Sequence, residues 1–327
     1  MKILITGAAG FIGFHAAQEF LRRGWDVAGL DSYSDYYSPA LKRERTGAIE
    51  AGSYPGAFTM HEADICDLDT LRAIIGDEKP DAVLHLAAQP GVRYSISHPF
   101  IYGKTNLEGF LNILECCRHA ARTPKLVFAS SSSVYGGNTK MPFEESDQVD
   151  TPVSLYAATK KANELMAHTY AHLYRMQTIG LRFFTVYGDW YRPDMALSLF
   201  ADAMLSGSPI KVFNNGDMLR DFTYVDDIVD GIVRVVEADN LPLYDIFNIG
   251  NHRSEKLLDV IETLADALGV KPEMEMLPMQ PGDVYATYAS IDKLNRAVGY
   301  APKTTIREGI PVFAQWHKRH YGYGKGL

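Results

Sequence analysis

Tyr156 and Lys160 lie four residues apart, and on a helix this spacing puts both side chains on one face. A free phenol has a pKa near ~10, so a phenol that accepts a proton near pH 7 needs its pKa lowered by roughly 3 units, or about 4 kcal/mol. A lysine ammonium beside the phenol stabilises its charged form and lowers that pKa. The pair therefore predicts proton exchange with a hydroxyl group of a substrate.

A run of four serines, Ser130–Ser133, follows an apolar stretch that we predict as a strand. Doubly wound folds bind their ligands at the carboxyl ends of strands. A serine in this position can hydrogen-bond the reacting hydroxyl and pass its proton to the phenolate. Taken alone the run would be a polar loop, but together with Tyr156 and Lys160 it predicts a catalytic group.

A glycine-rich turn, Gly7–Gly13, directly follows the first apolar strand and opens the first helix. Gly7 would make the tight turn, Gly10 would let the backbone approach a pyrophosphate, and Gly13 would allow close packing of helix on strand. The phosphates would lie at the helix N-terminus, near Phe11 and Ile12. This context predicts a dinucleotide site.

Asp31 ends the second predicted strand. A carboxylate there can accept both ribose hydroxyls of a dinucleotide and would repel a 2′-phosphate. No arginine follows it immediately, so the predicted cofactor is NAD rather than NADP.

Two further segments follow predicted strands and are expected to border the cofactor. Asp64 and Ile65 follow the third strand, where they meet the adenine ring unless Asp64 is an ordinary helix cap. Leu86, Ala87 and Ala88 end the fourth strand with small residues, so that the backbone can run close to NAD.

Short apolar strands alternate with amphipathic stretches in the first half, which predicts a parallel sheet covered by helices on both faces. The predicted strands are Lys2–Thr6, Asp26–Asp31, Ala57–His61, Ala82–Leu86, Lys125–Ser130 and Thr178–Phe183. The predicted helices between them are Phe11–Arg23, Asp67–Gly76, Ile101–Ala121 and Leu155–Arg175.

The second half is less regular and predicts a separate, smaller lobe. Its expected strands are Ile210–Phe213 and Asp245–Ile249, and its expected helices are Ala196–Leu205, Val225–Glu237, Glu255–Leu268 and Ile306–His320. The fold class is therefore α/β: a Rossmann-type doubly wound parallel sheet over residues 1–185, with return segments near 220–250. A C-terminal α/β substrate-binding lobe is expected over residues 186–327.

Composition excludes several other classes of protein. The net charge of −8 leaves no basic stripe for a nucleic acid, and no apolar run is long enough to span a membrane. The N-terminus lacks the features of a signal peptide, so a cytoplasmic location is expected. Cys66, Cys116 and Cys117 have no zinc-ligand spacing, so no metal is predicted.

Several motifs together resemble the extended short-chain dehydrogenases that act on nucleotide sugars, and the resemblance covers nearly the whole chain. The motifs are Gly7–Gly13, Leu84–Gln89, Ser130–Gly136, the Tyr156/Lys160 pair and Arg220–Asp227. The chain looks still more similar to the UDP-glucuronate 4-epimerases at Asp35–Tyr37, Gly91–Ser95, Ser154–His168, Leu181–Gly188 and Arg192–Ala196.

The resemblance implies reversible C4 epimerisation through a transient 4-keto sugar. Tyr156 would remove the proton from the sugar O4 while the C4 hydride passes to a tightly bound NAD. The keto sugar would then turn over, and the hydride would return to its opposite face. Ser131 aligns with the catalytic serine or threonine of the family.

A 4-keto uronic acid is a β-keto acid that loses carbon dioxide readily, so an epimerase must hold the carboxylate in a protected orientation. The candidate groups are the hydroxyls of Ser131, Ser132 and Thr185, with Arg93 or Arg192 nearby. Arginine suits a carboxylate or a diphosphate because its fork binds two oxygens.

The nucleotide part of the substrate is expected at residues that the resemblance alone assigns. Arg220 is similar to the family arginine at the diphosphate. Lys211, Val212 and Phe213 are similar to the strand that borders uracil, and Asp283 is similar to the ribose-side loop.

Two departures lie near the expected sugar pocket. The family usually has Pro-Trp-Gly before its Arg-Pro-Asp-Met segment, whereas this chain has Asp189, Trp190 and Tyr191; Pro90 stands in place of a common alanine. Alternatives are therefore decarboxylation to a UDP-pentose, 4-epimerisation of a neutral UDP-sugar, and a non-catalytic NAD-binding sensor. A 4,6-dehydratase is disfavoured because Ser132 and Ser133 replace its Asp-Glu pair.

The two long helices predicted at Ile101–Ala121 and Leu155–Arg175 carry apolar residues on more than one face, including Leu165, Met166 and Leu173. Related enzymes pack these helices into a four-helix bundle. A homodimer is therefore expected, with an internal core as the alternative.

Overall fold

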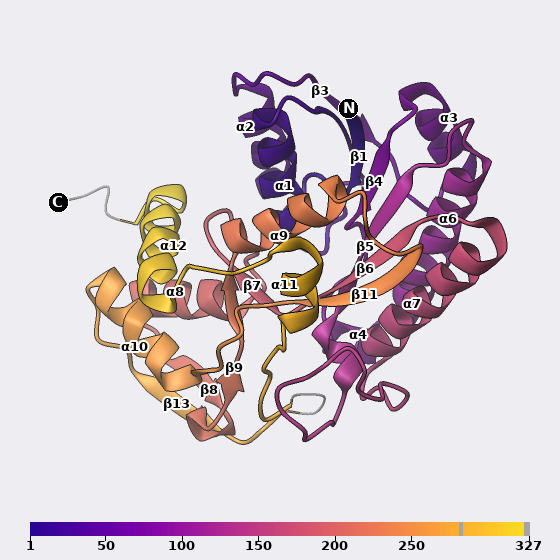
Figure 1. Cartoon of the computed structure of the whole chain (residues 1–327). Helices are drawn as coiled ribbons and strands as arrows, with labels where there is room; N and C mark the ends of the chain where they lie inside the picture. Colours follow the sequence, from indigo (N-terminus) through magenta and orange to yellow (C-terminus); the bar gives the residue numbers. More distant parts are fainter. Residues whose placement is uncertain (281–283, 324–327) are drawn as a thin grey trace.

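A seven-stranded parallel sheet forms the centre of the computed structural model, which describes residues 1–280 and 284–323 (Figure 1). The strand order is β11-β6-β5-β4-β1-β2-β3. The strands are β1 Lys2–Thr6, β2 Asp26–Asp31, β3 Phe58–Glu62, β4 Ala82–His85, β5 Lys125–Ser131, β6 Thr178–Phe183 and β11 Tyr244–Ile249. The order reverses at β1, so ligands are expected at the carboxyl ends of β1 and β4.

Helices cover both faces of this sheet because its strands are apolar on both faces. Ile3 and Ile5 of β1 pack in one core cluster with Phe14, whereas Leu4 packs in the other with Phe110. The first face carries α1 Phe11–Arg22, α2 Pro39–Glu50 and α9 Val225–Glu237. The second face carries α3 Leu68–Glu78, α6 Gly109–His119 and α7 Leu155–Tyr174 (Figure 1). The predicted doubly wound α/β fold is confirmed.

The helix expected over residues 101–121 is interrupted. The short helices α4 Tyr94–Ser97 and α5 Pro99–Tyr102 come first, and a π-helical segment, Gly103–Glu108, then leads into α6. In that widened turn the Asn106 side chain accepts a hydrogen bond from the Gln89 backbone N–H at 2.8 Å. The interruption therefore ties this helical segment to the loop after β4.

The second lobe gathers three helices and short strand pairs at the left of Figure 1. Its elements are α8 Ala196–Ser206, β8 Ile210–Phe213, β9 Leu219–Arg220, β12 Glu255–Lys256, α10 Leu257–Leu268, β13 Met274–Leu277 and α12 Ile306–His320. Strand β13 runs parallel to β8, whereas β12 runs antiparallel to β9. Helix α11, Asp292–Val298, packs instead against β11 and α9.

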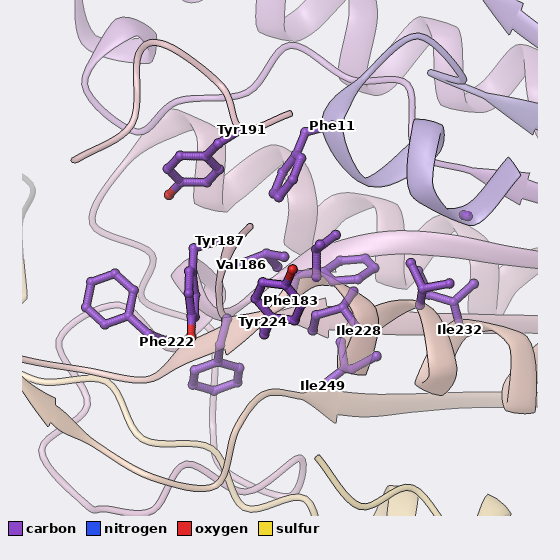
Figure 2. Close-up of a cluster of buried hydrophobic side chains, with 14 of the residues drawn as sticks. Phe11, Phe183, Val186, Tyr187, Tyr191, Phe222, Tyr224, Ile228, Ile232 and Ile249 are labelled. Carbon is purple, nitrogen blue, oxygen red and sulfur yellow. The ribbon is translucent and has the colours of Figure 1, made fainter. Parts of the chain in front are cut away.

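The two lobes meet across an apolar joint. Strand β7, Thr185–Tyr187, pairs in parallel with β10, Phe222–Tyr224. Figure 2 shows the aromatic side chains of these strands together with Phe183, Phe11 and Tyr191. The sequence analysis did not predict β7 and β10 because three-residue strands leave no clear periodicity.

Helix α2 was also not predicted from the sequence. Its buried side chains are Leu41, Lys42, Arg45, Thr46 and Ile49. Three of these five residues are polar, so the helix carries no apolar stripe at helical spacing. Within the described ranges, each helix is too short or too polar to cross a lipid bilayer.

Candidate active site

A cavity of about 1050 Å³ lies at the carboxyl ends of the central strands and extends to the second lobe. The predicted site residues that border it are Gly7, Gly10, Phe11, Ile12, Gly13, Asp31, Asp64, Ile65, Leu86, Ala87, Ala88, Arg93, Ser131, Ser132, Tyr156, Lys160, Thr185, Arg192, Lys211, Phe213 and Arg220. The fold thus brings the expected cofactor and substrate residues together around one space.

Two residues of the sequence-based set are exceptions. Val212 is 0% exposed and packs in the hydrophobic core rather than bordering the cavity. Its neighbours Lys211 and Phe213 do border the cavity, because successive side chains of a strand point to opposite faces. Asp283 lies outside the described residues.

The glycine turn is packed too tightly for side chains. A Cβ on Gly7 would lie 2.8 Å from the Ala87 nitrogen, and a Cβ on Gly13 would lie 2.1 Å from the Gly7 oxygen. Gly7 also has φ +74°, which favours glycine. Helix α1 begins after Gly10 without a side-chain cap, so its first N–H groups face the cavity end unsatisfied by the helix. This arrangement fits a pyrophosphate.

Asp31 is held at the edge of the cavity by backbone donors. Its carboxylate accepts hydrogen bonds from the Ala9 N–H at 3.1 Å and the Tyr33 N–H at 2.9 Å. Burial raises the pKa of Asp31, while the ammonium of Lys42 and the two backbone bonds counteract the rise. Lys42, which the sequence analysis did not single out, also borders the cavity and donates to the Ser34 carbonyl at 2.7 Å.

Asp64 does not cap helix α3, which excludes the alternative role considered for it. Asp67 is the N-cap and accepts a hydrogen bond from the Thr70 N–H. Asp64 instead accepts from the Cys66 N–H at 2.9 Å, and it borders the cavity beside Ile65. Both residues therefore border the cavity, and their contact with an adenine ring stays a prediction.

Lys160 is buried at the cavity wall, and its ammonium donates to the Ala129 carbonyl at 2.9 Å. Burial lowers the pKa of Lys160 to about 8. The neighbouring helical turn presents Tyr156 to the same cavity. Burial raises the pKa of the Tyr156 phenol, whereas a hydrogen bond from Ser131 and the charge of Arg192 lower it.

The direction of hydrogen bonds at Ser131 explains its effect on Tyr156. The Ser131 oxygen accepts from the Ser133 N–H at 3.1 Å and from the Ser133 hydroxyl at 2.9 Å. A hydroxyl has one proton to donate and two lone pairs. With both lone pairs engaged, Ser131 is set to donate its proton toward Tyr156, which stabilises the phenolate.

A buried ion pair lies beside the carboxyl end of β5 and is hydrogen-bonded to it. Arg182 binds Glu164 through two hydrogen bonds of 2.8 and 2.9 Å. The Ser130 hydroxyl donates to the same Glu164 carboxylate at 2.7 Å. These residues tie α7, which carries Tyr156, to β5 and β6. The sequence analysis did not identify them because their pairing joins separate elements.

Arg192 borders the cavity and pairs with Asp194, whose carboxylate it meets through its Nε at 3.0 Å. The Tyr36 hydroxyl donates to the other oxygen of Asp194 at 3.1 Å. Tyr36 comes from the segment after β2, so a residue of the nucleotide half helps to orient an arginine of the second lobe.

Two other arginines approach the cavity near the second lobe. The Arg93 guanidinium lies 5.4 Å from the centre of the Phe213 ring. Arg220 donates to the Val284 carbonyl at 2.6 Å and to the Tyr285 carbonyl at 3.0 Å. These contacts join the loop after β4 to β8 and connect β9 to the segment near residue 284.

The residues that depart from the family pattern have different surroundings. Asp189 does not border the main cavity; it borders a separate groove between α1 and α9. The Tyr191 ring is 1% exposed and packs against Phe11 and Phe313, with centroid distances of 5.1 and 5.7 Å. The bulk of Tyr191 therefore mainly fills the joint between lobes, although it also reaches the cavity wall. Pro90 presents its carbonyl to the Tyr102 hydroxyl at 2.7 Å.

Comparisons with known proteins identify relatives along the whole chain. The model of the family described as NAD dependent epimerase/dehydratase matches residues 3–250. Protein CapI of Staphylococcus aureus is 47% identical, over 98% of this chain and 99% of that protein. A probable UDP-glucuronate 4-epimerase of Rhizobium meliloti is 43% identical, over 98% of each chain.

A solved structure gives the same architecture. The UDP-glucuronic acid 4-epimerase of Bacillus cereus, in complex with UDP-glucuronic acid and NAD, is 34% identical and superimposes with a TM-score of 0.90. The match covers 98% of this chain and 100% of that chain.

Proposed function

This chain belongs to the NAD dependent epimerase/dehydratase family, and from that premise we propose that it is a UDP-glucuronate 4-epimerase that interconverts UDP-glucuronate and UDP-galacturonate. One observation carries the proposal: a single cavity, which the glycine turn also borders, is lined by Ser131, Tyr156, Lys160 and Arg192. The relatives named above support the choice of a uronate.

NAD fits the nucleotide half of the cavity. The turn Gly7–Gly13 would hold its pyrophosphate, Asp31 its adenosine ribose, and Asp64 and Ile65 its adenine, with Leu86, Ala87 and Ala88 along its path. When bound, NAD supplies reversible hydride removal at C4 of the sugar. Because the cofactor is regenerated in each cycle, the reaction needs no external reductant.

The chain itself supplies the proton transfer. Tyr156 accepts the proton of the O4 hydroxyl and gives it back after the sugar has turned. Ser131 stabilises the phenolate by donating a hydrogen bond, and the ammonium of Lys160, one helical turn away, would stabilise it by its charge. The proton therefore moves between Tyr156 and the sugar O4, beside the buried side chains of Ser131 and Lys160.

The carboxylate of the uronate requires its own site. The hydroxyls of Ser131, Ser132 and Thr185 border the cavity and would hold the carboxylate so that its C–C bond is poorly aligned with the C4 ketone. This orientation slows loss of carbon dioxide, which separates an epimerase from a decarboxylase.

Arginines and the β8 strand account for the UDP part of the substrate. We assign Arg93, Arg192 and Arg220 to the diphosphate region, since a guanidinium binds two phosphate oxygens at once. Lys211 and Phe213 would border the uracil, and the buried Val212 contributes no side chain to it.

The assembly and layout are also proposed. Leu165 and Leu173 are 57% and 60% exposed on α7, which supports a homodimer in which α6 and α7 of two copies form a four-helix bundle.

We propose that residues 1–185, with α9 and β11, form the NAD-binding domain and that most of residues 186–327 form the lobe that binds the UDP-sugar. The cytoplasmic location stays a prediction.

The decisive experiment is to incubate the purified protein with UDP-glucuronate and follow the anomeric protons by NMR, with and without added NAD. A UDP-galacturonate signal that grows to a steady ratio is expected, and it should be lost in a Tyr156→Phe variant. A UDP-pentose signal would replace the proposal by decarboxylation. No change with UDP-glucuronate, but turnover of a neutral UDP-sugar, would refute the uronate assignment; no turnover at all would favour an NAD-binding sensor.

A further inference from the structure

Arg45 of helix α2 is completely buried and does not border the cavity. Among the residues that the structure describes, no carboxylate forms an ion pair with it. Burying an arginine without a counter-charge is costly unless its donors are well used. The positions of its hydrogen-bond acceptors therefore indicate why an arginine stands here.

The guanidinium of Arg45 bridges the two halves of the site. One terminal nitrogen donates to the Ala9 carbonyl at 3.0 Å, and the other donates to the Trp190 carbonyl at 2.6 Å. Ala9 lies in the glycine turn, directly before Gly10, which is the N-cap of α1. Trp190 lies two residues before Arg192.

Other contacts reinforce the same junction. The His15 ring of α1 hydrogen-bonds the Asp189 carbonyl at 3.0 Å. The Phe11 ring, which opens α1, packs edge-on against Tyr191 (Figure 2). Three consecutive residues before Arg192 are thus held by the nucleotide-binding elements.

The backbone at this junction is strained and requires such support. Trp190 has φ +54°, a left-handed conformation that non-glycine residues rarely adopt. Its ring is held against Phe14 and Trp316, at centroid distances of 5.1 and 5.9 Å. A strained segment persists only where its surroundings over-determine it, and the Arg45 bridge is the polar part of that restraint.

We propose that Arg45 is a positioning residue that links the glycine turn to Arg192, so that NAD and the UDP moiety of the substrate are held by one rigid unit. This positioning role rests on the proposed UDP-sugar site, but it does not require the sugar to be a uronate. Arg45 touches neither ligand; it acts through the Ala9 carbonyl on one side and through the Trp190 carbonyl on the other.

The test uses the NAD-loaded protein and UDP, which binds without being epimerised. UDP affinity is measured by calorimetry for wild type, Arg45→Met, Arg192→Met and the double variant. Arg45→Met removes the charged donor that bonds the Ala9 and Trp190 carbonyls, so Arg192 is no longer held in place. We expect UDP binding to weaken roughly tenfold. In the Arg192→Met background, the same change should cost less than about twofold, since residues that act through each other are not additive.

Retention of NAD during gel filtration is a second readout that needs no substrate. Arg45→Met should lose NAD faster than wild type, because the Ala9 carbonyl loses its donor. Arg43→Met is the matched control: Arg43 lies on the same helix, pairs with Glu62 on the surface, and should leave both UDP binding and NAD retention unchanged.

Arg45→Lys keeps the charge but lacks the two-pronged fork that reaches both carbonyls, and it provides the test if the methionine variant does not fold. A bridge requires weaker UDP binding and faster NAD loss in this variant too. Full wild-type behaviour of Arg45→Lys, or additive costs with Arg192→Met, would overturn the proposal. No effect of Arg192→Met on UDP binding would also overturn it, whereas a wild-type protein that binds no UDP would refute the UDP-sugar assignment itself.

Discussion

At the level of single residues, the proposed chemistry depends on charges that are kept away from water. Lys160 donates to the Ala129 carbonyl from a buried position, and Ser131 is polarised by two bonds from Ser133. Ser131 favours the charged form of the Tyr156 phenol, which burial alone disfavours. In the proposed mechanism the ammonium of Lys160, one helical turn away, favours it too. The phenol can therefore exchange a proton with the sugar only while these partners keep their protons.

The pH dependence of the reaction tests this view. Because burial lowers the pKa of Lys160 to about 8, its ammonium is present below that pH and lost above it. The active form needs the Tyr156 phenolate and the Lys160 ammonium together. Because burial raises the pKa of Tyr156, the phenolate fraction grows with pH. We therefore expect kcat/KM for UDP-glucuronate to rise by about tenfold per pH unit below the Lys160 pKa and to level off above it, where loss of the ammonium offsets the gain in phenolate. Initial rates of UDP-galacturonate formation, followed from about pH 6 to about pH 10 on both sides of the Lys160 pKa, measure this pH dependence.

The control for this prediction is Lys160→Arg, whose guanidinium stays protonated throughout the range. Its rate will be lower because the geometry changes, but the rate should keep rising above the Lys160 pKa because the guanidinium charge is not lost. A wild-type rate that keeps rising well above the Lys160 pKa, while circular dichroism shows a folded protein, would contradict the role given to this lysine.

At the level of secondary-structure elements, α7 must be held in register with β5 for Tyr156 to meet Ser131. The Glu164–Arg182 pair does this from α7 to β6, with side chains only 1% and 3% exposed. The π-helical segment before α6 contributes from another side, because Asn106 bonds both the loop after β4 and Thr159 of α7. Helix α7 is thus fixed at two points along its first three turns.

Removing the charge of Glu164 should therefore be severe for stability. In Glu164→Gln the Arg182 guanidinium stays buried without a counter-charge, and breaking such a pair costs about 3–5 kcal/mol of the free energy of unfolding. Urea unfolding followed by circular dichroism measures the loss. Glu62→Gln is the matched control: its pair with Arg43 is 57% exposed on both sides, and such surface pairs contribute about 0–1 kcal/mol. Similar losses in both variants would refute this account.

At the level of the whole molecule, α6 and α7 lie at the right of Figure 1, away from the second lobe at the left. Helix α7 exposes Leu165 and Leu173, while α6 exposes Leu111 at 41%. Burying these leucines in a second copy would remove apolar surface from water without blocking the cavity.

The proposed dimer can be broken by charge. Leu165→Lys combined with Leu173→Lys should convert a dimer into a monomer in light scattering coupled to gel filtration, because two ammonium groups would be buried unpaired. Val312→Lys on α12 is the control, since Val312 is 45% exposed but lies on the other lobe. A wild-type monomer, or a dimer that survives the double change, would show that these helices are not the interface.

The sequence by itself revealed the motifs whose residues lie close together along the chain. The glycine turn, the Tyr156–Lys160 pair and the strand-to-loop position of Ser131 are local patterns, and all of these residues border one cavity. Strand and helix periodicity likewise predicted the doubly wound sheet, because its strands are continuous apolar runs. Helix α2 escaped this reasoning because Lys42, Arg45 and Thr46 occupy its buried face.

Only the tertiary structure decided which distant residues meet. The Arg45–Trp190 contact joins residues 145 positions apart, and the Glu164–Arg182 pair joins a helix to the following strand. The side chain of Val212 packs in the core, and Asp189 borders a separate groove rather than the main cavity. Such partners depend on how separate elements pack, and a polar side chain in the sequence does not reveal whether its partner is water or a carbonyl from another lobe.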